Sequence, residues 1–405
     1  MGFPRLTLGG AVAGVLAVGT VQADEWSATP RVSAGVEHDS NKTLVIRDPI
    51  SASGVIVDAA VALGWATETS NLVLTPRVRW GRYNEEPDLL DHTDFYLDLA
   101  SSGSTERARY GLNGNLTLDS VDTSQTIAEE EGLRRLRREN VDRNRRNLAP
   151  SWSYILTERD TASLSGSFTW VDYDESDLLQ GGYVDYRYHV LNASLAHAFT
   201  ERDTVSLIGY YSRYSRDLFD AVTDSVGMQV GYEHQFSETL KGSVAAGAVR
   251  SDFSSDADDL LDSGDDTEYG QLINASLSQR LERDQWTLSA GRTLSPTGDG
   301  VLVRRDEVRG DYWRQLTERL TGHIGGLLYH DESPTKAGGI LRPDRTYGRV
   351  ELGLAYQLSP YWTLRGQYRY RFEEYDLLGG GDDRADSDSF LISIAWQGEK
   401  YATAR

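Results

Sequence analysis

The sequence predicts an all-β protein, a transmembrane antiparallel up-and-down β-barrel of about 18 strands with short periplasmic turns and long extracellular loops. A polar turn, Thr157-Glu158-Arg159-Asp160, returns in full or in part at steps of 36 to 52 residues. The stretches beside each turn alternate apolar and polar residues, the period of a strand with one buried face. After the N-terminal 23 residues, no window of the sequence approaches the ~20 apolar residues that a membrane-spanning helix needs. Propeller blades would divide such a repeat into four short strands, whereas here each repeat holds two long ones.

Residues 1–23 are expected to be a secretory signal peptide. Arg5 supplies its positive charge, Leu6 to Val18 its apolar stretch, and Val21-Gln22-Ala23 its cleavage site. The apolar stretch is short for a membrane span, although a retained N-terminal anchor is the alternative. No Pro/Gly/Ser linker divides the rest, so residues 24–405 are expected to form one barrel in the outer membrane of a Gram-negative bacterium.

The turns set the number of strands. Eight turns separate strand pairs, and nine longer loops complete a chain of eighteen strands, an even number as a closed bacterial barrel requires. The turns are expected at Thr67–Asn71, Thr105–Arg107, Thr157–Asp160, Thr200–Asp203, Ser237–Thr239, Glu282–Asp284, Thr317–Arg319 and Ser359–Pro360.

Alternation assigns each strand an outer and an inner face. In the stretch that follows Pro360, one face carries Leu364 and Phe372, and the other carries Arg365, Arg369 and Arg371. An arginine on the lipid face at mid-membrane costs about 2–4 kcal/mol, so the arginine-bearing faces are expected to line the lumen.

The last predicted strand alternates Phe390, Ile392, Ile394 and Trp396. An apolar alternation that ends in an aromatic residue resembles the C-terminal signal that the outer-membrane assembly machinery reads. We therefore expect this machinery to be a partner, although the chain continues for nine residues after Trp396.

Several short stretches resemble one family of proteins. These are Gly35-x-x-x-Asp39-x-Asn41, the stretch from Leu148 to Tyr154 before a turn, and Val171-Asp-Tyr-Asp174 followed by Val184-Asp-Tyr186. They look like the putative outer-membrane β-barrel porin family, which is often encoded with exopolysaccharide biosynthesis and export systems. The resemblance implies an outer-membrane barrel, and exopolysaccharide export as a function.

The composition excludes several kinds of site and partner. The chain has no cysteine, which excludes disulfides and thiolate metal sites. The net charge of −21 argues against nucleic acid as a partner. No cofactor or metal motif is present. Clustered carboxylates between Asp252 and Glu268 could hold divalent cations bridged to lipopolysaccharide, but they lack EF-hand spacing, and a solvated loop is the alternative.

The loop from about Asp119 to Arg146 is the longest and the third on its rim. Arginines cluster in it, and such a loop folded into the lumen would make an anion-selective constriction. The alternative is an external loop whose charges pair with its own acidic residues. The expected constriction residues are Arg134, Arg135, Arg137 and Arg138.

A second candidate site is the lumen itself. Guanidinium groups that face inward would bind carboxylate, sulfate or phosphate groups of passing solutes. The alternative is structural, because acids such as Asp58, Asp311 and Glu351 also face inward and could pair with the arginines. The expected lumen residues are Arg77, Arg79, Arg107, Arg109, Arg365, Arg369 and Arg371.

These observations lead to three hypotheses of function. The first is an anion-preferring passive channel for small anions or acidic polysaccharide, set in outer-membrane lipid and lipopolysaccharide. The second is a non-conducting barrel that holds assembly partners. The third is a surface enzyme, although G-x-S-x-G, H-E-x-x-H and a Gly-rich phosphate loop are all missing, so we predict that the protein is not an enzyme.

Overall fold

The computed structural model describes residues 25–121, 141–174, 183–216, 221–254, 266–297, 302–332, 344–376 and 382–404. The signal peptide expected over residues 1–23 lies outside them. The elements are β1 (Glu25–Asp39), β2 (Ala52–Ala66), β3 (Ser70–Tyr83), α1 (Pro87–Leu90), β4 (His92–Ser104), β5 (Ala108–Ser120), β6 (Asp142–Ile155), β7 (Asp160–Tyr173), β8 (Tyr186–Ala198), β9 (Asp203–Arg216), β10 (Ala221–Gln235), β11 (Leu240–Ser254), β12 (Asp266–Arg280), β13 (Asp284–Pro296), β14 (Leu302–Gln315), β15 (Leu320–Glu332), β16 (Arg345–Gln357), β17 (Trp362–Asp376), β18 (Asp382–Gln397) and β19 (Tyr401–Ala404).

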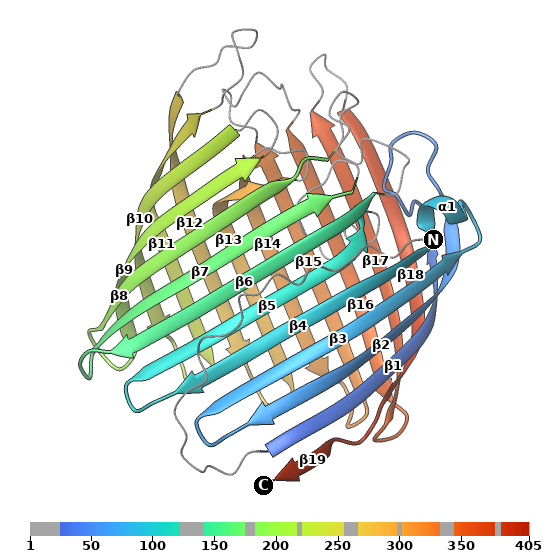
Figure 1. Ribbon diagram of the computed structural model, residues 1–405, viewed down its shortest axis with the longest axis horizontal. Coiled ribbons are helices and arrows are strands. Elements are labelled where there is room, and N and C mark those ends of the chain that lie inside the picture. The colour runs from blue at the N-terminus through green and yellow to red at the C-terminus, as the bar shows by residue number, and fades with distance from the viewer. Residues whose placement is uncertain are drawn as a thin grey trace.

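The strands form one closed antiparallel barrel (Figure 1). Each of the strands β1 to β17 pairs with the next, and β18 pairs with β1 from Arg31↔Gln397 to Asp39↔Ser389, which closes the wall. The fold class and the eighteen long strands predicted from the sequence are confirmed. Among the described residues no helix could cross a bilayer, since α1 is a single turn.

The two faces of the wall differ as alternation predicts, and β10 shows this well. Val226, Met228 and Val230 point outward and are each about 60% exposed, whereas Ser225 and Gln229, on the other face of the strand, are buried. Antiparallel pairing around the whole circumference satisfies the backbone without water, which lets the apolar outer face meet lipid. The chain is an outer-membrane barrel.

Tryptophan follows the same rule, with one exception. All nine tryptophans lie in described strands. Strand alternation places eight of them on the outer face, where interfacial aromatic residues anchor a barrel. Trp313 alone has the parity of the lumen-facing residues of β14. The outward tryptophans are Trp26, Trp65, Trp80, Trp152, Trp170, Trp286, Trp362 and Trp396.

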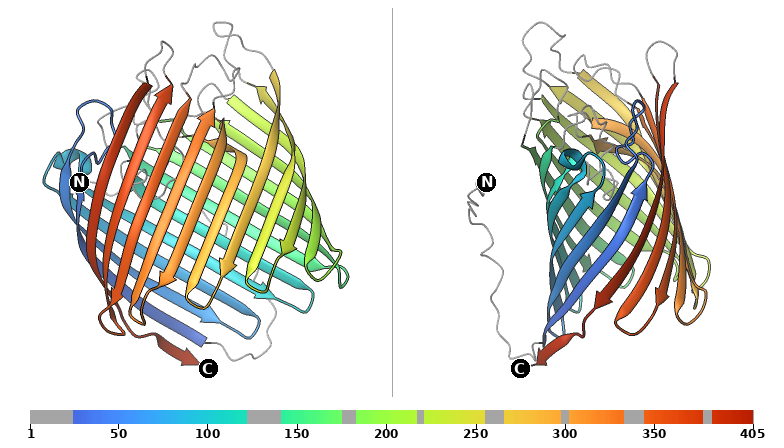
Figure 2. Two further views of the ribbon diagram at one scale, coloured as in Figure 1. Left: turned by 180° about the vertical axis from the view of Figure 1, so that it is seen from behind. Right: turned by 90° about the vertical axis from the view of Figure 1, so that its right-hand side faces the viewer.

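The eight short turns lie at one end of the barrel, the turn rim, and the longer connections lie at the other, the loop rim (Figure 2). Hydroxyl groups organise most of these turns. The Thr157 hydroxyl accepts hydrogen bonds from the backbone N–H of Asp160 at 3.0 Å and of Arg159 at 3.2 Å, and Thr200 repeats this with Asp203 and Arg202. Serine or threonine recurs at turn starts because its side chain satisfies amides that have no ladder partner.

The residues after Trp396 extend the barrel seam. The backbone N–H of Gly398 donates to the carbonyl of Pro30 at 2.9 Å, and β19 then pairs with the first residues of β1, from Glu25↔Ala404 to Ala28↔Tyr401. Lys400 contacts Glu25 at 2.5 Å. The C-terminal extension therefore covers a stretch of β1 that β18 does not reach.

Deleting residues 398–405 should weaken the seam, because it exposes the amides of β1 at the turn rim. Each lost neutral hydrogen bond is worth about 1 kcal/mol, so we expect a lower urea midpoint for the barrel refolded in vesicles. Lys400→Ala serves as the control, because it removes one exposed ion pair and keeps the β19 ladder. An unchanged midpoint after the deletion would show that β19 adds nothing to closure.

Two sequence-based placements need correction. Arg107, expected both in the turn Thr105–Arg107 and among the lumen residues, lies in that turn, before β5 begins. The third loop is also shorter than expected, because β5 runs to Ser120 and β6 starts at Asp142. Arg143, Arg145 and Arg146 therefore belong to β6. Both placements fail for the same reason: polar and charged side chains suit a lumen or a rim as well as they suit a turn.

Candidate functional site in the lumen

The structure brings most of the expected lumen arginines to the inner wall. Alternation places Arg77 and Arg79 of β3, and Arg365, Arg369 and Arg371 of β17, on the inner face. Arg109 also has the parity of the inward residues of β5. It is the second residue of that strand and so lies beside the turn rim. Arg134, Arg135, Arg137 and Arg138 lie outside the described residues, and so does the expected constriction.

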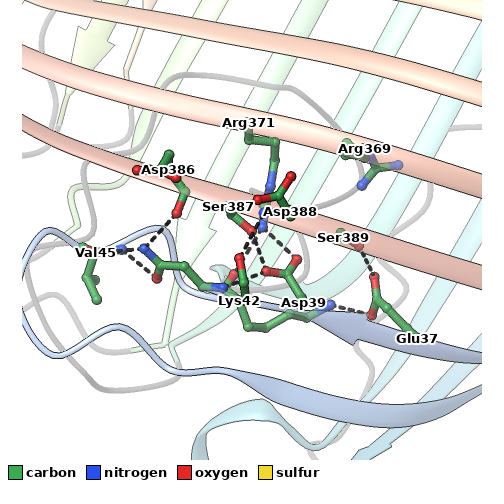
Figure 3. Close-up of polar contacts among 12 residues, drawn as sticks. Glu37, Asp39, Lys42, Val45, Arg369, Arg371, Asp386, Ser387, Asp388 and Ser389 are labelled. Carbon is green, nitrogen blue, oxygen red and sulfur yellow. Dashed lines mark hydrogen bonds and ion pairs between the residues drawn. The ribbon is translucent and has the colours of Figure 1, made fainter.

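Arg371 is locked in a buried ion pair. Its Nη2 donates to Asp39 Oδ2 at 2.9 Å, and both side chains are almost fully buried (Figure 3). Asp39 Oδ1 also accepts hydrogen bonds from Ser387 Oγ at 2.5 Å and from the backbone N–H of Asn41 at 3.0 Å. A carboxylate with this many donors holds its guanidinium firmly, so the role of Arg371 is to join β17 to β1 and β18.

The connection between β1 and β2 folds into the lumen beside this pair. Lys42 is buried, with its Nζ 2.5 Å from Glu37 Oε2 and 4.8 Å from the centre of the Tyr83 ring. Its carbonyl accepts a 3.5 Å hydrogen bond from Arg371. Leu44, at a φ of 49°, packs against the buried cluster of Leu327, Tyr329 and Tyr347 on β15 and β16. The segment therefore covers the inner wall of strands that are not neighbours of β1 or β2.

A second set of ion pairs crosses β14 to β17 near the loop rim. Arg305 binds Asp331 through two hydrogen bonds of 2.6 and 2.9 Å and stacks on Tyr329 at 4.0 Å. Arg345 contacts both Asp331, at 3.9 Å, and Glu373. Cations and carboxylates thus alternate from strand to strand, and their mutual contacts stiffen this side of the wall.

Arg369 lies two residues from Arg371 along β17, on the side of the turn rim, and is only partly exposed. Its Nε lies 3.4 Å from Glu351, a carboxylate that Arg349 also approaches at 3.8 Å. Across the barrel, Arg77 contacts Asp58 at 3.7 Å and stacks on the Tyr96 ring at 4.0 Å. For these two arginines, therefore, the pairing with inward acids considered from the sequence is present.

Arg109 and Arg365 are different, because both are exposed at the turn-side end of the lumen. Arg365 shares an inner face with Gln367 and Arg369 and lies opposite Ala355 and Ser393 in the neighbouring strands. Arg109 lies opposite Ser104 and Ser153. With no acid directly across the ladder, these guanidinium groups are available to solutes in the lumen.

One part of the remaining wall is mostly neutral. A cavity of about 590 Å³ lies against the inner face of β8 to β14. Small and hydroxyl-bearing side chains dominate its lining, among them Ser194, Thr204, Ser243, Asn274 and Ser289. The lining of this cavity thus consists mainly of neutral hydrogen-bonding groups, with Glu233 and Glu307 as its charged members.

The end of the β13–β14 hairpin leaves the wall. Pairing of β12 with β13 stops at Ile273↔Arg292, whereas β13 and β14 stay paired to Pro296↔Leu302. In Figure 2 (left) the β13–β14 pair ends below the tops of its neighbours. The Tyr188 hydroxyl of β8 donates to the Leu294 carbonyl at 3.3 Å, although β8 and β13 are not adjacent. The hairpin end therefore reaches across the loop-side mouth to the β7–β9 wall, where Leu302 joins a buried tyrosine cluster.

Tyr188→Phe should loosen the hairpin end, because it removes the hydrogen bond to Leu294. A neutral hydrogen bond is worth about 1 kcal/mol, so the population with a released hairpin should rise about fivefold. We expect more frequent transitions to a higher conductance level in single-channel recordings. Tyr210→Phe is the control, since it removes the 3.1 Å contact with Tyr188 and keeps the bond to Leu294. Identical traces for the two variants would contradict a role for this contact.

Sequence reasoning missed Lys42, the inward β13–β14 hairpin and Trp313. A positive-φ leucine and a pairing register that ends early have no signal in the sequence. Trp313 could have been found, because alternation along β14 puts it with Arg305, Glu307, Arg309 and Asp311. Each inward position of β14 from 305 to 311 carries a charged side chain, and Trp313 is the next inward position.

No protein-family model and no curated protein matched the sequence. The expected membership of the putative β-barrel porin family therefore stays a prediction. Solved outer-membrane barrels resemble the chain in fold. OpdK of Pseudomonas aeruginosa is 10% identical, with 93% of this chain and 99% of that chain covered and a TM-score of 0.45. OccAB4 of Acinetobacter baumannii is 11% identical, with 93% and 98% covered and a TM-score of 0.44. OccK2 of P. aeruginosa, solved with glucuronate, is 11% identical, with 92% and 98% covered and a TM-score of 0.43.

Proposed function

We propose that the protein is a passive, anion-preferring channel across the outer membrane. The observation that carries the proposal is a pair of exposed guanidinium groups, Arg109 and Arg365, at the turn-side end of a lumen in which Arg77, Arg369 and Arg371 contact carboxylates. Fixed positive charge in a lumen with low-dielectric walls attracts anions and repels cations. Arg77 and Arg369 lie farther toward the loop rim, where they contact Asp58 and Glu351.

The solutes that suit this lumen are small carboxylates, sulfates and phosphates, and segments of an acidic polymer. Acidic exopolysaccharide export is the version of the proposal that the sequence resemblance suggests. A chain with many acidic groups would exchange one arginine contact for the next, so that it is not held at any single site.

The proposal is tested by single-channel recording of the refolded protein in a planar bilayer with a salt gradient. We expect the sign of the reversal potential to show that anions permeate more readily than cations. A cation-selective channel would overturn the proposal. Folding is checked in the same sample by a heat-dependent gel shift.

A non-conducting barrel is the second candidate, and one observation favours it. Both the β1–β2 connection and the β13–β14 hairpin end fold into the loop-side mouth. A silent bilayer with a folded protein would support this candidate over the channel. Such a barrel would act by holding partners, and a folded but silent protein should then co-purify with one.

Lipopolysaccharide is the lipid partner that we propose. Ion pairs lie on the outer face near the loop rim, above the apolar band, as in Arg146–Asp172, Arg213–Asp224 and Arg292–Asp306. Their guanidinium groups have the geometry to bind lipid phosphates.

A further inference from the structure

Trp313 does not face outward as the other eight tryptophans do. An interfacial tryptophan anchors a barrel by facing lipid, whereas Trp313 faces the lumen and remains 46% exposed there. Exposing a large aromatic surface to water has a cost, which a binding role would offset. Its position is near the turn rim, two residues before the end of β14.

The ring of Trp313 is held by a stack on one face. The His323 ring of β15 lies parallel to it, with 3.8 Å between ring centroids and 18° between planes. His323 is in turn fixed between Asp311 at 3.4 Å and Glu351 at 3.7 Å. Gly325 leaves room for this imidazole, because a Cβ at that position would approach the ring at 3.1 Å. One face of the indole is therefore occupied, and its orientation is set.

The polar groups next to Trp313 complete a binding surface. Asp311 and Arg309 precede it on the same inner face of β14, and their side chains are 42% and 44% exposed. Arg309 to Trp313 spans about 13 Å at 3.3 Å per residue, which is longer than one sugar ring. An exposed indole, a carboxylate and a guanidinium thus follow one another along the path that a solute takes.

We propose that Trp313, Asp311 and Arg309 form a binding site for an acidic oligosaccharide at the turn-side entrance of the lumen. The apolar C–H face of a pyranose ring stacks on the indole, as a flat apolar surface does on an aromatic ring. Sugar hydroxyls donate to Asp311, and a carboxylate on a neighbouring sugar binds Arg309. The site rests on the proposed channel function and assigns it a substrate class.

Three probes separate the parts of the site. Trigalacturonate has rings and carboxylates, maltotriose has rings without charge, and gluconate has a carboxylate without a ring. Binding is measured as the concentration that blocks half of the single-channel current, and independently as the change in tryptophan fluorescence of the folded protein in detergent. The second readout works even if the barrel does not conduct.

Trp313→Ala should weaken binding of trigalacturonate and maltotriose about fivefold, and leave gluconate unchanged, since stacking is worth about 1 kcal/mol. Trp313→Phe should keep part of the affinity and lose most of the fluorescence change. Arg309→Ser should weaken trigalacturonate and gluconate but not maltotriose. Trp286→Ala, which removes an outward tryptophan from the neighbouring strand, is the matched control and should change no affinity.

The site is overturned if Trp313→Ala binds all three probes as the wild type does, or if the wild type prefers gluconate to trigalacturonate. The channel proposal is tested independently of the site, because its test is the reversal potential recorded without any saccharide. A cation-selective barrel that still binds trigalacturonate through Trp313 would retain the site and lose the anion channel.

Discussion

The double variant Arg109→Ser with Arg365→Ser is expected to lose most of its preference for anions. The two side chains are exposed guanidinium groups at the turn-side end, and no acid lies directly across the ladder from either. Two unit charges 4 Å apart in water interact by about 1 kcal/mol, so each removed charge should lower the anion-to-cation permeability ratio up to about fivefold. The ratio is obtained from the reversal potential in a KCl gradient.

Salt concentration and a nearby arginine provide the controls for this variant. The difference from the wild type should shrink at 1 M KCl, where the Debye length is about 3 Å, and be largest at 0.1 M, where it is about 10 Å. Arg107→Ser removes an equally exposed arginine from the adjacent turn, outside the strand, and should have the smaller effect. If Arg107→Ser alters selectivity as much as Arg109→Ser, the relevant charge is that of the rim and not that of the lumen.

Arg371→Met is expected to destabilise the barrel strongly while changing selectivity little. It leaves the Asp39 carboxylate buried without its guanidinium partner, a change that typically costs about 3–5 kcal/mol. It also removes a contact with the Lys42 carbonyl, so the β1–β2 connection loses one of its attachments to the lumen wall. We expect a lower urea midpoint and larger current fluctuations.

The double variant Arg371→Met with Asp39→Asn shows whether the stability is lost because a buried carboxylate has no partner or because the arginine side chain itself is missing. The neutral amide can still interact with Ser387, so the double variant should regain much of the stability lost by Arg371→Met. Arg365→Ser should leave the urea midpoint nearly unchanged, because that arginine is exposed. If the double variant is no more stable than Arg371→Met, the burial of Asp39 is not the cause.

Strand-level features were predictable because they depend on local rules. Alternation with a period of two separates Val226, Met228 and Val230 from Ser225 and Gln229 without reference to any distant residue. The turn hydroxyls of Thr157 and Thr200 bond to amides two and three residues away. The same alternation put Arg77, Arg79, Arg365, Arg369 and Arg371 on the inner face.

Which of those arginines is available to a solute was not predictable. Arg371 is bound by a carboxylate 332 positions away in the chain, and that contact exists only because β18 closes on β1. Arg365 has the same parity on the same strand and stays exposed. Arg371 reaches past the small Ser387 of β18 to Asp39 of β1, whereas Arg365 lies opposite Ala355 and Ser393, nearer the turn rim.

The sequence by itself therefore determined the barrel, its eighteen long strands and its two faces, because period and turn chemistry are properties of short segments. Only the tertiary structure decided that Lys42 and the β13–β14 hairpin end enter the lumen. Both depend on contacts with strands that are not their neighbours. Leu44 packs against the cluster that contains Tyr329, and the Leu294 carbonyl accepts a hydrogen bond from Tyr188. Such contacts form only when closure of the wall sets opposite sides of the barrel within reach of each other, and no local pattern encodes that distance.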